Sequence, residues 1–449
     1  MVSNSKFRQQ KPAKNVWKLL YNKLFREILV PLFLMITTPN LTILLSYIIL
    51  KQNKPLTEAL IYDFPTTIQN AWLTVHWFDL QCWTAIGLLL GWGLISLHLP
   101  AKPYNGPITS NGFTPKYWHT GFRFYLISMA ITVPLLYIYR VSHLFDKLYD
   151  FTGNLIVFGF IVCLFLYIKG LLWPSKGLHN RTGNPIFDYY WGIELYPHLS
   201  ARISLKILII CRFGLILWQY IVLLCWKSNY ESLANGQFNY ALTASTILQS
   251  IYLAKFFYWE DGYMNTIDTS VDRFGYMVCW GCIAYVPGFY PITSLYLSVQ
   301  PLNPNYTFQV FLLNLLCGIA VIGLNYWSDQ QKLVFRATNG KCIIWGKPAK
   351  LIRAEYEDDF GKVRKSILLT SGFWGLTRHI NYTFELMSTF LWCIPSLFNS
   401  PVPYLYLLFL TVLLIHRSVR DDNKCAKKYG KYWQQYKGVV KYQMIPYVY

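Results

Sequence analysis

The chain has 449 residues, and its 41 Lys and Arg outnumber its 21 Asp and Glu, which gives a formal net charge of +20. Only 14% of the residues are charged and 54% are hydrophobic, whereas a soluble domain carries about 25% charged residues. This composition excludes an ordinary soluble globule, and it excludes intrinsic disorder, which requires low hydrophobicity. An excess of Lys and Arg could indicate nucleic-acid binding, but here these residues lie between long apolar blocks. We therefore predict an all-α polytopic membrane protein without a nucleic-acid partner.

Long apolar blocks occur along the whole chain. A helix that spans a bilayer needs about 20 mostly apolar residues. About ten blocks meet this requirement: 28–50, 78–99, 122–140, 151–173, 204–226, 237–258, 275–299, 307–327, 371–397 and 401–416. We expect each block to form a transmembrane helix.

Three of these blocks are interrupted, and the first of them, 28–50, is expected to break at Pro39 and Asn40. The block 275–299 contains Gly288 and Pro291, and the block 371–397 contains a polar group that begins at Arg378. Irregular backbone at membrane depth is tolerated only where it is buried in protein or lines a cavity. The blocks 275–299 and 371–397 are therefore expected to line a functional site.

Basic residues are concentrated in three polar segments, which are residues 1–27, the loop 326–370 and the tail after residue 416. With ten spans these segments lie on one side of the membrane, and the positive-inside rule then places both termini in the cytosol. The loop 259–274 is cytosolic by the same count. It is acidic, however, because it contains Glu260, Asp261, Asp268 and Asp272. Acidic residues hardly influence topology, so we interpret this loop as a sign of function.

The loop 341–369 alternates apolar and polar residues and has a turn signal at 359–361. This pattern predicts a small cytosolic β-hairpin that could act as a lid. The dinucleotide fingerprint, the P-loop and the H-E-x-x-H zinc motif are absent, and the His residues are not clustered at ligand spacing. We expect no metal, and any cofactor would be held by a site within the membrane domain.

Polar and ionisable side chains are most concentrated in the C-terminal tail. Functional groups recur there at spacings of three, four or seven residues: Arg417, Asp421, Cys425, Lys428, Tyr429 and Tyr436. On a helix this spacing places them along one face. Guanidinium and ammonium groups beside a carboxylate fit a phosphorylated nucleotide, although a solvated helix attracted to anionic lipid is the alternative. The polar residues near His379 favour the ligand, because ionisable groups at membrane depth are usually functional.

Several motifs resemble those of the membrane sterol reductases, which saturate sterol double bonds with NADPH. The two most specific are SGFWGLTRHINY at 371–382 and HRSVRDDNKCAKKYGKYWQQY at 416–436. Weaker matches are GPITSNGFTPKY at 106–117, GIELYP at 192–197, TIDTSVDRFGY at 266–276, QKLVFR at 331–336 and CIIWGKP at 342–348. The similarity runs from about residue 104 to the end of the chain. The stretch at 106–117 favours the branch that reduces the Δ7 double bond, and Δ14 and Δ24-type reduction remain open.

The resemblance implies a transmembrane reductase domain over 28–449, preceded by the cytosolic segment 1–27. Its C-terminal half, about 259–449, would hold a pocket for NADPH that opens to the cytosol and a pocket for the sterol that opens to the lipid. By position, Lys332 and Arg336 would hold the phosphates. The remaining cofactor-binding residues by position are Leu369, Trp374, Asn381, Tyr382, Asp421, Cys425, Ala426, Lys427, Lys428, Tyr429 and Tyr436. Eukaryotic members of this family imply an endoplasmic-reticulum membrane, whereas a bacterial source would imply the inner membrane.

The chemistry requires an acid as well as a hydride. An isolated ring alkene is not electrophilic, so a carbon must be protonated before hydride from C4 of the nicotinamide can add. Buried carboxyls and phenols suit this task. The candidate catalytic residues are Asp421, Tyr429, Tyr436 and Glu260, with Asp268 and Asp272 as support. For Glu260 and Asp268, helix capping or pairing with Lys255 and Arg273 is an equally weighted alternative.

Several positions depart from the family pattern, and Tyr196, Pro197 and His198 stand where the family has an asparagine–proline pair followed by an Arg or similar residue. Asp329 replaces a usual Asn, Cys282 replaces an Asp and Thr293 replaces a common Gln. We expect these residues to line the sterol pocket, so reductase chemistry is better supported than the position of the double bond. Two other classes remain open, namely a membrane methyltransferase that uses S-adenosylmethionine and a non-catalytic sterol-binding membrane protein. A transporter is disfavoured because the two halves show no inverted repeat.

Overall fold

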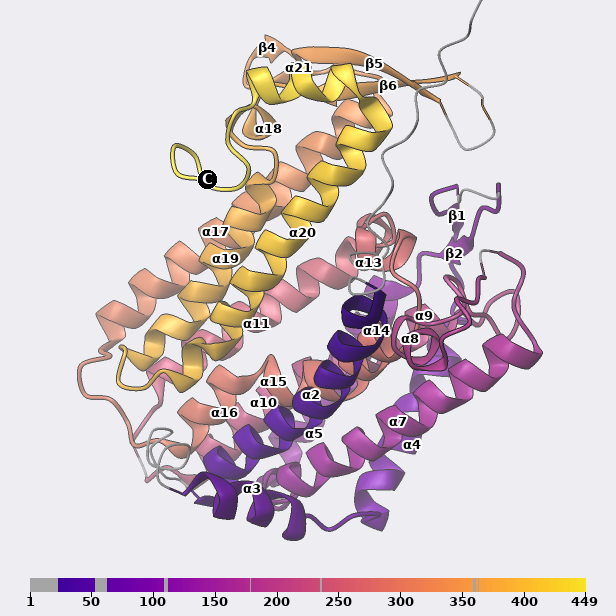
Figure 1. Cartoon of the computed structure of the whole chain (residues 1–449). Helices are drawn as coiled ribbons and strands as arrows, with labels where there is room; N and C mark the ends of the chain where they lie inside the picture. The colour runs from indigo at the N-terminus through magenta and orange to yellow at the C-terminus, as the bar shows by residue number, and fades with distance from the viewer. Residues whose placement is uncertain are drawn as a thin grey trace, which may run out of the picture.

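The computed structural model describes residues 23–52, 63–108, 112–177, 179–234, 236–357, 361 and 363–449. Residues 1–22, which form most of the predicted basic N-terminal segment, lie outside the described residues. Residues 358–360 and 362, around the predicted hairpin turn, also lie outside them. The described chain is mainly helical (Figure 1), which confirms the predicted all-α fold class.

Each of the ten predicted apolar blocks contains helix. The first five blocks contain η1 (Phe25–Leu29), α2 (Val30–Tyr47), η2 (Ile48–Gln52), α4 (Leu80–Ser96), α5 (Gly121–Ile138), α7 (Leu148–Leu172), α9 (Leu205–Ile207), η4 (Leu208–Leu215) and α10 (Ile216–Ser232). The last five contain α11 (Tyr240–Tyr258), α14 (Tyr276–Trp280), η5 (Gly281–Tyr285), α15 (Val286–Phe289), α16 (Ile292–Val299), α17 (Phe308–Ala337), α18 (Phe373–Leu376), α19 (Ile380–Cys393), η6 (Ile394–Ser396), η7 (Val402–Tyr404) and α20 (Leu405–Tyr429). Short helices outside the blocks are α3 (Phe64–Leu73), α6 (Ser142–Asp146), α8 (Pro185–Trp191), α12 (Glu260–Tyr263), α13 (Ile267–Ser270) and α21 (Lys431–Val439).

Within the described residues, seven helical segments are long and apolar enough to cross a membrane by length and composition. They are Phe25–Gln52, Gly121–Ile138, Leu148–Leu172, Leu205–Ser232, Tyr276–Val299, Phe308–Ala337 and Val402–Tyr429. The other three predicted spans correspond to α4, α11 and α19, of which α4 has 17 residues and α19 has 14. Together these helices make the chain a multi-pass membrane protein.

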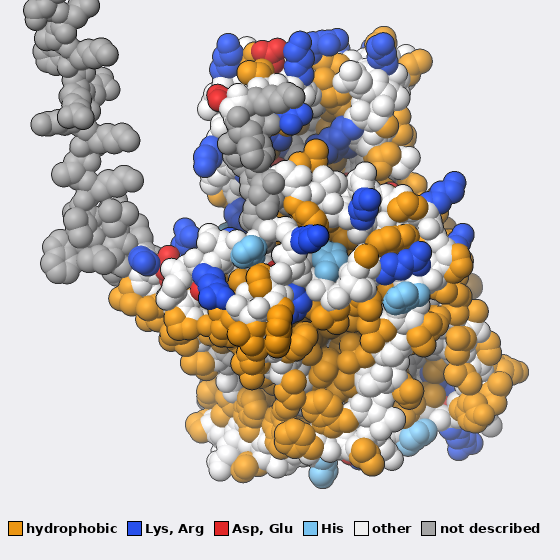
Figure 2. Space-filling view, turned by 90° about the vertical axis from the view of Figure 1, so that its right-hand side faces the viewer, with side chains coloured by type: hydrophobic (Ala, Val, Ile, Leu, Met, Phe, Trp, Pro, Cys, Tyr) orange, Lys and Arg blue, Asp and Glu red, His pale blue; other side chains and the backbone are white. Residues whose placement is uncertain are grey.

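The outer surface agrees with a lipid environment. Figure 2 shows a broad belt of hydrophobic side chains, with Lys and Arg gathered above it. Phe33, Leu88 and Ile131 are each more than half exposed. Exposed apolar surface on this scale marks contact with a membrane or a partner, and here it occurs on a bundle that contains helices of spanning length.

The predicted break at Pro39 and Asn40 is wrong, because α2 continues through both residues. The other two predicted interruptions are present. Pro291 lies between α15 and α16, so the block 275–299 is broken into separate helices. In the block 371–397, the long helix begins only at Ile380, and Arg378 and His379 precede it. The backbone before Ile380 instead bonds to the C-terminal segment, because the N–H groups of Arg378 and His379 donate to the carbonyl oxygens of Tyr442 and Gln443 at 3.0 and 2.9 Å.

The predicted hairpin is also present. Strands β5 (Leu351–Glu357) and β6 (Val363–Leu369) pair antiparallel, with Leu351 opposite Leu369 and Glu357 opposite Val363. The other short antiparallel pairs are β1 (Pro103–Asn105) with β2 (Lys116–Trp118) and β3 (Ile343–Ile344) with β4 (Lys347–Pro348). Figure 1 shows the β5–β6 hairpin and α21 lying across one end of α17, α19 and α20. The hairpin thus covers the end of the bundle that carries the sequence-predicted cofactor residues.

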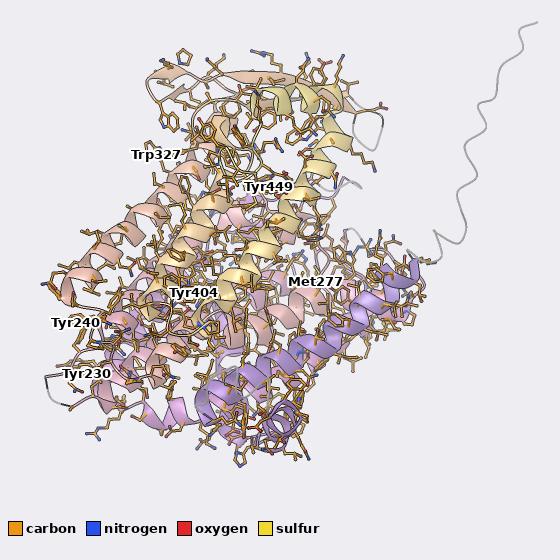
Figure 3. All side chains as sticks on the ribbon, turned by 60° about the vertical axis from the view of Figure 1, so that its left-hand side comes forward. Tyr230, Tyr240, Met277, Trp327, Tyr404 and Tyr449 are labelled. Atoms are coloured by element: carbon orange, nitrogen blue, oxygen red, sulfur yellow. The ribbon has the colours of Figure 1, made fainter. Side chains whose placement is uncertain are left out.

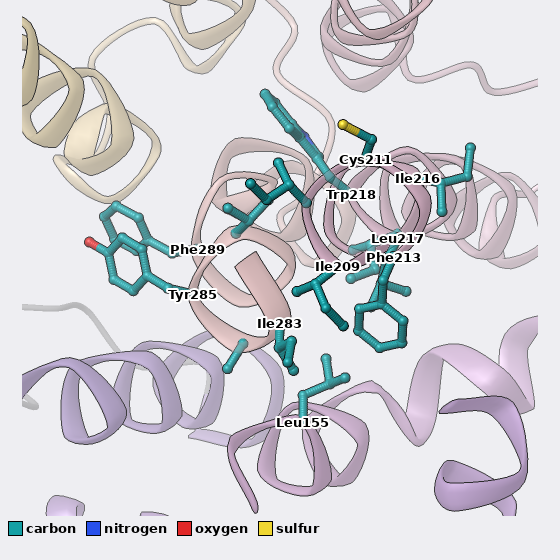
Figure 4. Packing of buried hydrophobic residues seen from close by; sticks show 14 of the residues in the cluster. Leu155, Ile209, Cys211, Phe213, Ile216, Leu217, Trp218, Ile283, Tyr285 and Phe289 are labelled. Atoms are coloured by element: carbon teal, nitrogen blue, oxygen red, sulfur yellow. The ribbon is translucent and has the colours of Figure 1, made fainter. Parts of the chain in front are cut away.

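The main core lies where η4 and η5 cross. In Figure 4, Leu155, Ile209, Phe213 and Ile283 gather between the helices, and all four are buried. A Cβ added to Gly214 would lie 2.3 Å from the carbonyl oxygen of Cys282, so only glycine permits this approach. In lipid, helices associate through such close packing rather than through the hydrophobic effect.

Candidate functional site

The candidate site lies at the end of the bundle beneath the hairpin, where α17, α18, α19, α20 and α21 meet (Figure 1). Figure 3 shows Trp327 of α17 and Tyr449 near this end, whereas Tyr230 and Tyr240 lie toward the opposite end. The ring of Trp327 contacts that of Phe373 of α18, with 5.1 Å between centroids. Segments that are far apart in the sequence therefore converge here.

Helix α18 is fixed to α17 by two hydrogen bonds. The backbone N–H of Phe373 donates to Gln331 Oε1 at 2.9 Å, and Trp374 Nε1 donates to the carbonyl oxygen of Ser328 at 2.8 Å. Gly372 has φ 66°, and a Cβ there would lie 2.3 Å from Gln331 Oε1. Glycine is therefore required at this position, because it tolerates positive φ and has no Cβ.

The predicted phosphate-binding residues lie on α17 beside α18. The Lys332 ammonium lies 3.6 Å from the centroid of the Trp374 ring, a distance typical of cation–π contacts. Arg336 follows one helical turn later and is exposed, and it forms no ion pair with the described residues. Leu369 is buried in one cluster with Phe335 and Trp374. The structure thus brings the first four predicted cofactor residues together.

The start of α19 adds polar groups to the same place. Asn381 Nδ2 donates to Asp329 Oδ1 at 3.2 Å, and its backbone carbonyl accepts from Asn325 Nδ2 at 2.9 Å. The His379 ring stacks on Tyr382, with 4.9 Å between centroids. The predicted residues Asn381 and Tyr382 are therefore held in a defined arrangement.

Asp421 of α20 faces this group. Its Oδ2 lies 3.8 Å from His379 Nε2 and accepts a 3.8 Å hydrogen bond from the Cys425 thiol. Ala426 packs with Cys425 against Tyr436 and Trp433. The helical spacing used to predict this face is therefore confirmed for Asp421 and Cys425.

The end of α20 faces the hairpin. The Lys428 ammonium lies 4.1 Å from the centroid of the Tyr356 ring. The Tyr429 hydroxyl is 3.4 Å from Ser366 Oγ. Lys427, by contrast, is exposed, and none of the described residues is its partner. The structure thus places Lys428 and Tyr429, but not Lys427, in contact with the hairpin.

The chain reverses its direction sharply before α21, which carries Tyr436. Gly430, with φ 52°, separates α20 from α21 and lets α21 fold back. The Tyr436 hydroxyl then lies 3.5 Å from the carbonyl oxygen of Trp374. Burial raises the pKa of Tyr436 above the ordinary phenol value, so the hydroxyl stays neutral and can donate a hydrogen bond.

Glu260 lies apart from these residues. Arg212 donates to both of its carboxylate oxygens, and the second bond measures 2.9 Å. The alternative partner Lys255 instead donates to Asn325, so the alternative pairing of Glu260 with Lys255 is wrong. Both Glu260 and Arg212 are buried, and Arg212 occupies both carboxylate oxygens of Glu260.

The other acidic residues of the loop also pair with distant arginines. Asp268 pairs with Arg417, and Asp272 with Arg420 at 2.5 Å. The expected partner Arg273 donates to the carbonyl oxygen of Asn180 at 2.7 Å, so the predicted pairing of Asp268 with Arg273 is also wrong. Sequence spacing suggested local partners, but the folded loop packs against α20.

The departures from the family pattern at Thr293, Asp329 and Cys282 have different surroundings. Thr293 is fully buried, and its hydroxyl donates to the carbonyl oxygen of Pro403 at 2.8 Å, which holds α16 against η7. Asp329 binds Asn381 in the candidate site. Cys282 is partly exposed on η5.

Two polar features near the site were not predicted from the sequence, namely the contact between Tyr252 and Glu385 and the buried Tyr263. Tyr252 of α11 donates its hydroxyl to Glu385 of α19. Tyr263 of α12 lies close enough to Asp268 and Arg417 for electrostatic interaction, and burial raises its pKa well above the ordinary phenol value. The presence of Glu385 within an apolar block was a usable signal, since carboxylates at membrane depth are rare. In the part of the chain that the structure describes, no group of three metal-ligating side chains occurs.

Comparison with known proteins gives a consistent result. The ergosterol biosynthesis ERG4/ERG24 family matches the chain over residues 24–449. The chain is 37% identical to a 7-dehydrocholesterol reductase of Arabidopsis thaliana, over 92% of this chain and 95% of that protein. It is 31% identical to a 7-dehydrocholesterol reductase of Xenopus laevis, over 81% of this chain and 80% of that protein. It is 32% identical to a Delta(14)-sterol reductase of Methylotuvimicrobium alcaliphilum, over 82% of this chain and 84% of that protein.

Proposed function

Because the chain belongs to the ergosterol biosynthesis ERG4/ERG24 family, we propose that it reduces the Δ7 double bond of a sterol with NADPH. Family membership makes it a membrane oxidoreductase of sterol biosynthesis that acts on a sterol carbon–carbon double bond and needs a reducing cofactor. The single observation that supports the finer proposal is the convergence of Lys332, Trp374, Asn381, Asp421 and Tyr436 beneath one hairpin.

The residues present fit a phosphorylated dinucleotide. Lys332 and Arg336 offer two cations one helical turn apart, which suits a diphosphate and a further phosphate. Deeper in the site, Asn381 Oδ1 and His379 Nε2 are buried without hydrogen-bond partners. Buried polar atoms without partners are costly, and the carboxamide and hydroxyl groups of NADPH would satisfy them. We therefore propose that NADPH binds with its phosphates toward α17 and its nicotinamide toward Asn381.

NADPH, when bound, supplies the hydride, and the protein must supply a proton and orientation. Tyr429 and Tyr436 direct their hydroxyls toward Ser366 and the Trp374 carbonyl, so we assign both to cofactor contacts. Asp421 remains the proposed acid of this site. Its carboxyl would donate the proton, directly or through an intervening hydroxyl, before the hydride adds.

The position of the double bond needs an experiment. The chain should be purified in lipid nanodiscs and supplied with NADPH and either 7-dehydrocholesterol or a Δ14-unsaturated sterol, and the products should be identified by mass spectrometry. We expect reduction of 7-dehydrocholesterol. Selective reduction of the Δ14 sterol would support the second candidate function, which is favoured by the similarity to a Delta(14)-sterol reductase. Inactivity on both sterols would contradict the proposal.

We also propose that the protein resides in the endoplasmic reticulum with both termini in the cytosol. The basic segments at 326–370 and after residue 416 support this orientation. In the space-filling view the Lys and Arg lie mainly to one side of the apolar belt (Figure 2). Protease protection of tags placed at the two termini of the full chain tests the orientation, and a protected terminus would contradict it.

A further inference from the structure

A polar network joins the helices α11, α17 and α19, which pack against one another next to the candidate site (Figure 1). Lys255 of α11 donates to Asn325 Oδ1 of α17, and its ammonium lies 3.9 Å from Asp329 Oδ2, one turn farther along α17. On α19, Asn381 Nδ2 donates to Asp329 Oδ1 at 3.2 Å. The Lys255 and Asp329 side chains are only 15% and 13% exposed, so water competes little for these contacts.

The charged groups give this network a fixed direction. An ammonium only donates hydrogen bonds and an ionised carboxylate only accepts them, whereas a side-chain amide has one donor end and one acceptor end. Because Lys255 is a donor, Asn325 must present its Oδ1 to it. Asn325 Nδ2 is thereby turned toward α19, where it donates to the Asn381 backbone carbonyl at 2.9 Å and to Glu385 Oε2 at 3.3 Å.

Asp329 fixes the side-chain amide of Asn381 in the same way. With Nδ2 toward the carboxylate a hydrogen bond forms, whereas the reversed amide would bring its oxygen against another acceptor, and the two would repel each other. The attraction between the Lys255 ammonium and the Asp329 carboxylate holds this acceptor in place. Asn381 Oδ1 therefore lies on the side of the amide away from Asp329. It is buried, and none of the described residues donates to it.

A buried acceptor without a partner is costly, and a ligand that brings an N–H donor would satisfy it. The carboxamide of a nicotinamide ring carries such a donor. We propose that Lys255 and Asp329 are positioning residues that hold Asn381 Oδ1 toward the NH₂ group of the nicotinamide carboxamide. The inference rests on the proposed function, and it adds to that site two residues that act through Asn381.

The test compares NADPH with its reduced analogue in which an acetyl group replaces the carboxamide. The acetyl group keeps the carbonyl oxygen but lacks the N–H donor. Dissociation constants are measured by titration calorimetry on the purified full chain in lipid nanodiscs, without sterol. The wild type should bind NADPH about tenfold more tightly than the acetyl analogue, because the analogue leaves a buried acceptor without a partner.

Asp329→Asn is the main variant. Its amide can present either its oxygen or its NH₂ group to Asn381, so the orientation of the Asn381 amide is no longer fixed. The variant should raise the Kd of NADPH about fivefold and change the Kd of the acetyl analogue less than about twofold. Lys255→Met, which removes the cation, should shift the two Kd values in the same direction. If Lys255→Met does not fold, Asp329→Asn decides the outcome.

Lys227→Met is the matched control. Lys227 of α10 also pairs with a carboxylate, that of Glu231 at 3.2 Å, and its side chain is 15% exposed, as is that of Lys255. Its ammonium lies 5.7 Å from the centroid of the Tyr230 ring, and Figure 3 shows Tyr230 toward the end of the bundle opposite the cofactor site. This variant should keep the wild-type Kd values for both cofactors.

Equal weakening of both cofactors in Asp329→Asn would make the network a purely structural one and overturn the inference. A wild type that binds NADPH and the acetyl analogue equally well would also overturn it, because Asn381 Oδ1 would then not accept from the carboxamide, and the proposed function would stand. A wild type that binds neither cofactor would overturn the proposed function itself, and the inference with it.

Discussion

Arg417 of α20 forms an ion pair with Asp268 of α13, although 149 residues separate them in the sequence. Arg417 lies one helical turn before Asp421, the proposed acid. The acidic loop therefore fixes the rotation and depth of the helix face that carries Asp421 and Cys425. This relationship gives the loop 259–274 a physical role that its sequence only suggested.

Removing this ion pair should disturb the cofactor site without abolishing the fold. Asp268→Asn leaves the partly exposed Arg417 guanidinium without its counter-ion, which weakens the contact that holds α20 against α13. We expect the KM for NADPH to rise by about tenfold or more. The neighbouring Asp261→Asn is the control, because among the described residues the Asp261 carboxylate accepts only from the N–H of Gly262 in its own loop. Equal KM values for the two variants would contradict the positioning role of Asp268.

Arg336 is predicted to distinguish NADPH from NADH. Its guanidinium is exposed beside Lys332, and bidentate contact with a phosphate is worth roughly 1.5–3 kcal/mol. Arg336→Ala should therefore raise the KM for NADPH by about ten- to a hundredfold and barely change the KM for NADH. The two cofactors serve as controls for each other. A similar rise for both would place the 2′-phosphate elsewhere.

Asp421 and Asp422 offer a matched pair of neighbouring carboxylates. Asp421→Asn should lower kcat by about a hundredfold, the usual scale for general acid catalysis, while the protein remains folded. Asp422 instead accepts from Trp433 Nε1 at 3.0 Å and pairs with Lys437 and with Arg378, each at 3.6 Å. Asp422→Asn should therefore lower the melting temperature and leave kcat nearly unchanged. Wild-type turnover by Asp421→Asn would remove Asp421 from the chemistry.

Gly372 provides a test of how α18 is held on α17. Gly372→Ala adds a Cβ at a position with φ 66° and only 2.3 Å from Gln331 Oε1. The strain and the displaced hydrogen bond should cost about 1–3 kcal/mol and weaken NADPH binding by moving Trp374. Gly323→Ala is the control, because a Cβ there meets no atom within 4 Å. Unchanged NADPH affinity in Gly372→Ala would show that Trp374 does not contact the cofactor.

Much of the fold could be predicted because its signals are local. The apolar blocks, the break before Ile380 and the alternation in β5 and β6 each follow from a short stretch of sequence. The spacing of Asp421 and Cys425 predicted a shared helix face for the same reason. Such patterns need no knowledge of which elements pack together.

The partners of the acidic residues could not be predicted in this way. Arg212 and Glu260 are 48 residues apart, and Asp329 and Asn381 are 52 apart. Which cation meets which carboxylate depends on how the helices pack, and the sequence offered nearer candidates such as Lys255. The partner of Thr293 could not be predicted for the same reason, since its bond to the Pro403 carbonyl forms only when η7 packs against α16.

The central claim is that this membrane bundle transfers a hydride from NADPH to a protonated sterol double bond. The most direct measurement uses NADPH deuterated at C4, the purified chain and 7-dehydrocholesterol, with the product analysed by mass spectrometry. The account predicts one deuterium in each product sterol, and a second one on the adjacent carbon when the reaction is run in D₂O. A reduced sterol without deuterium from the cofactor would contradict the account.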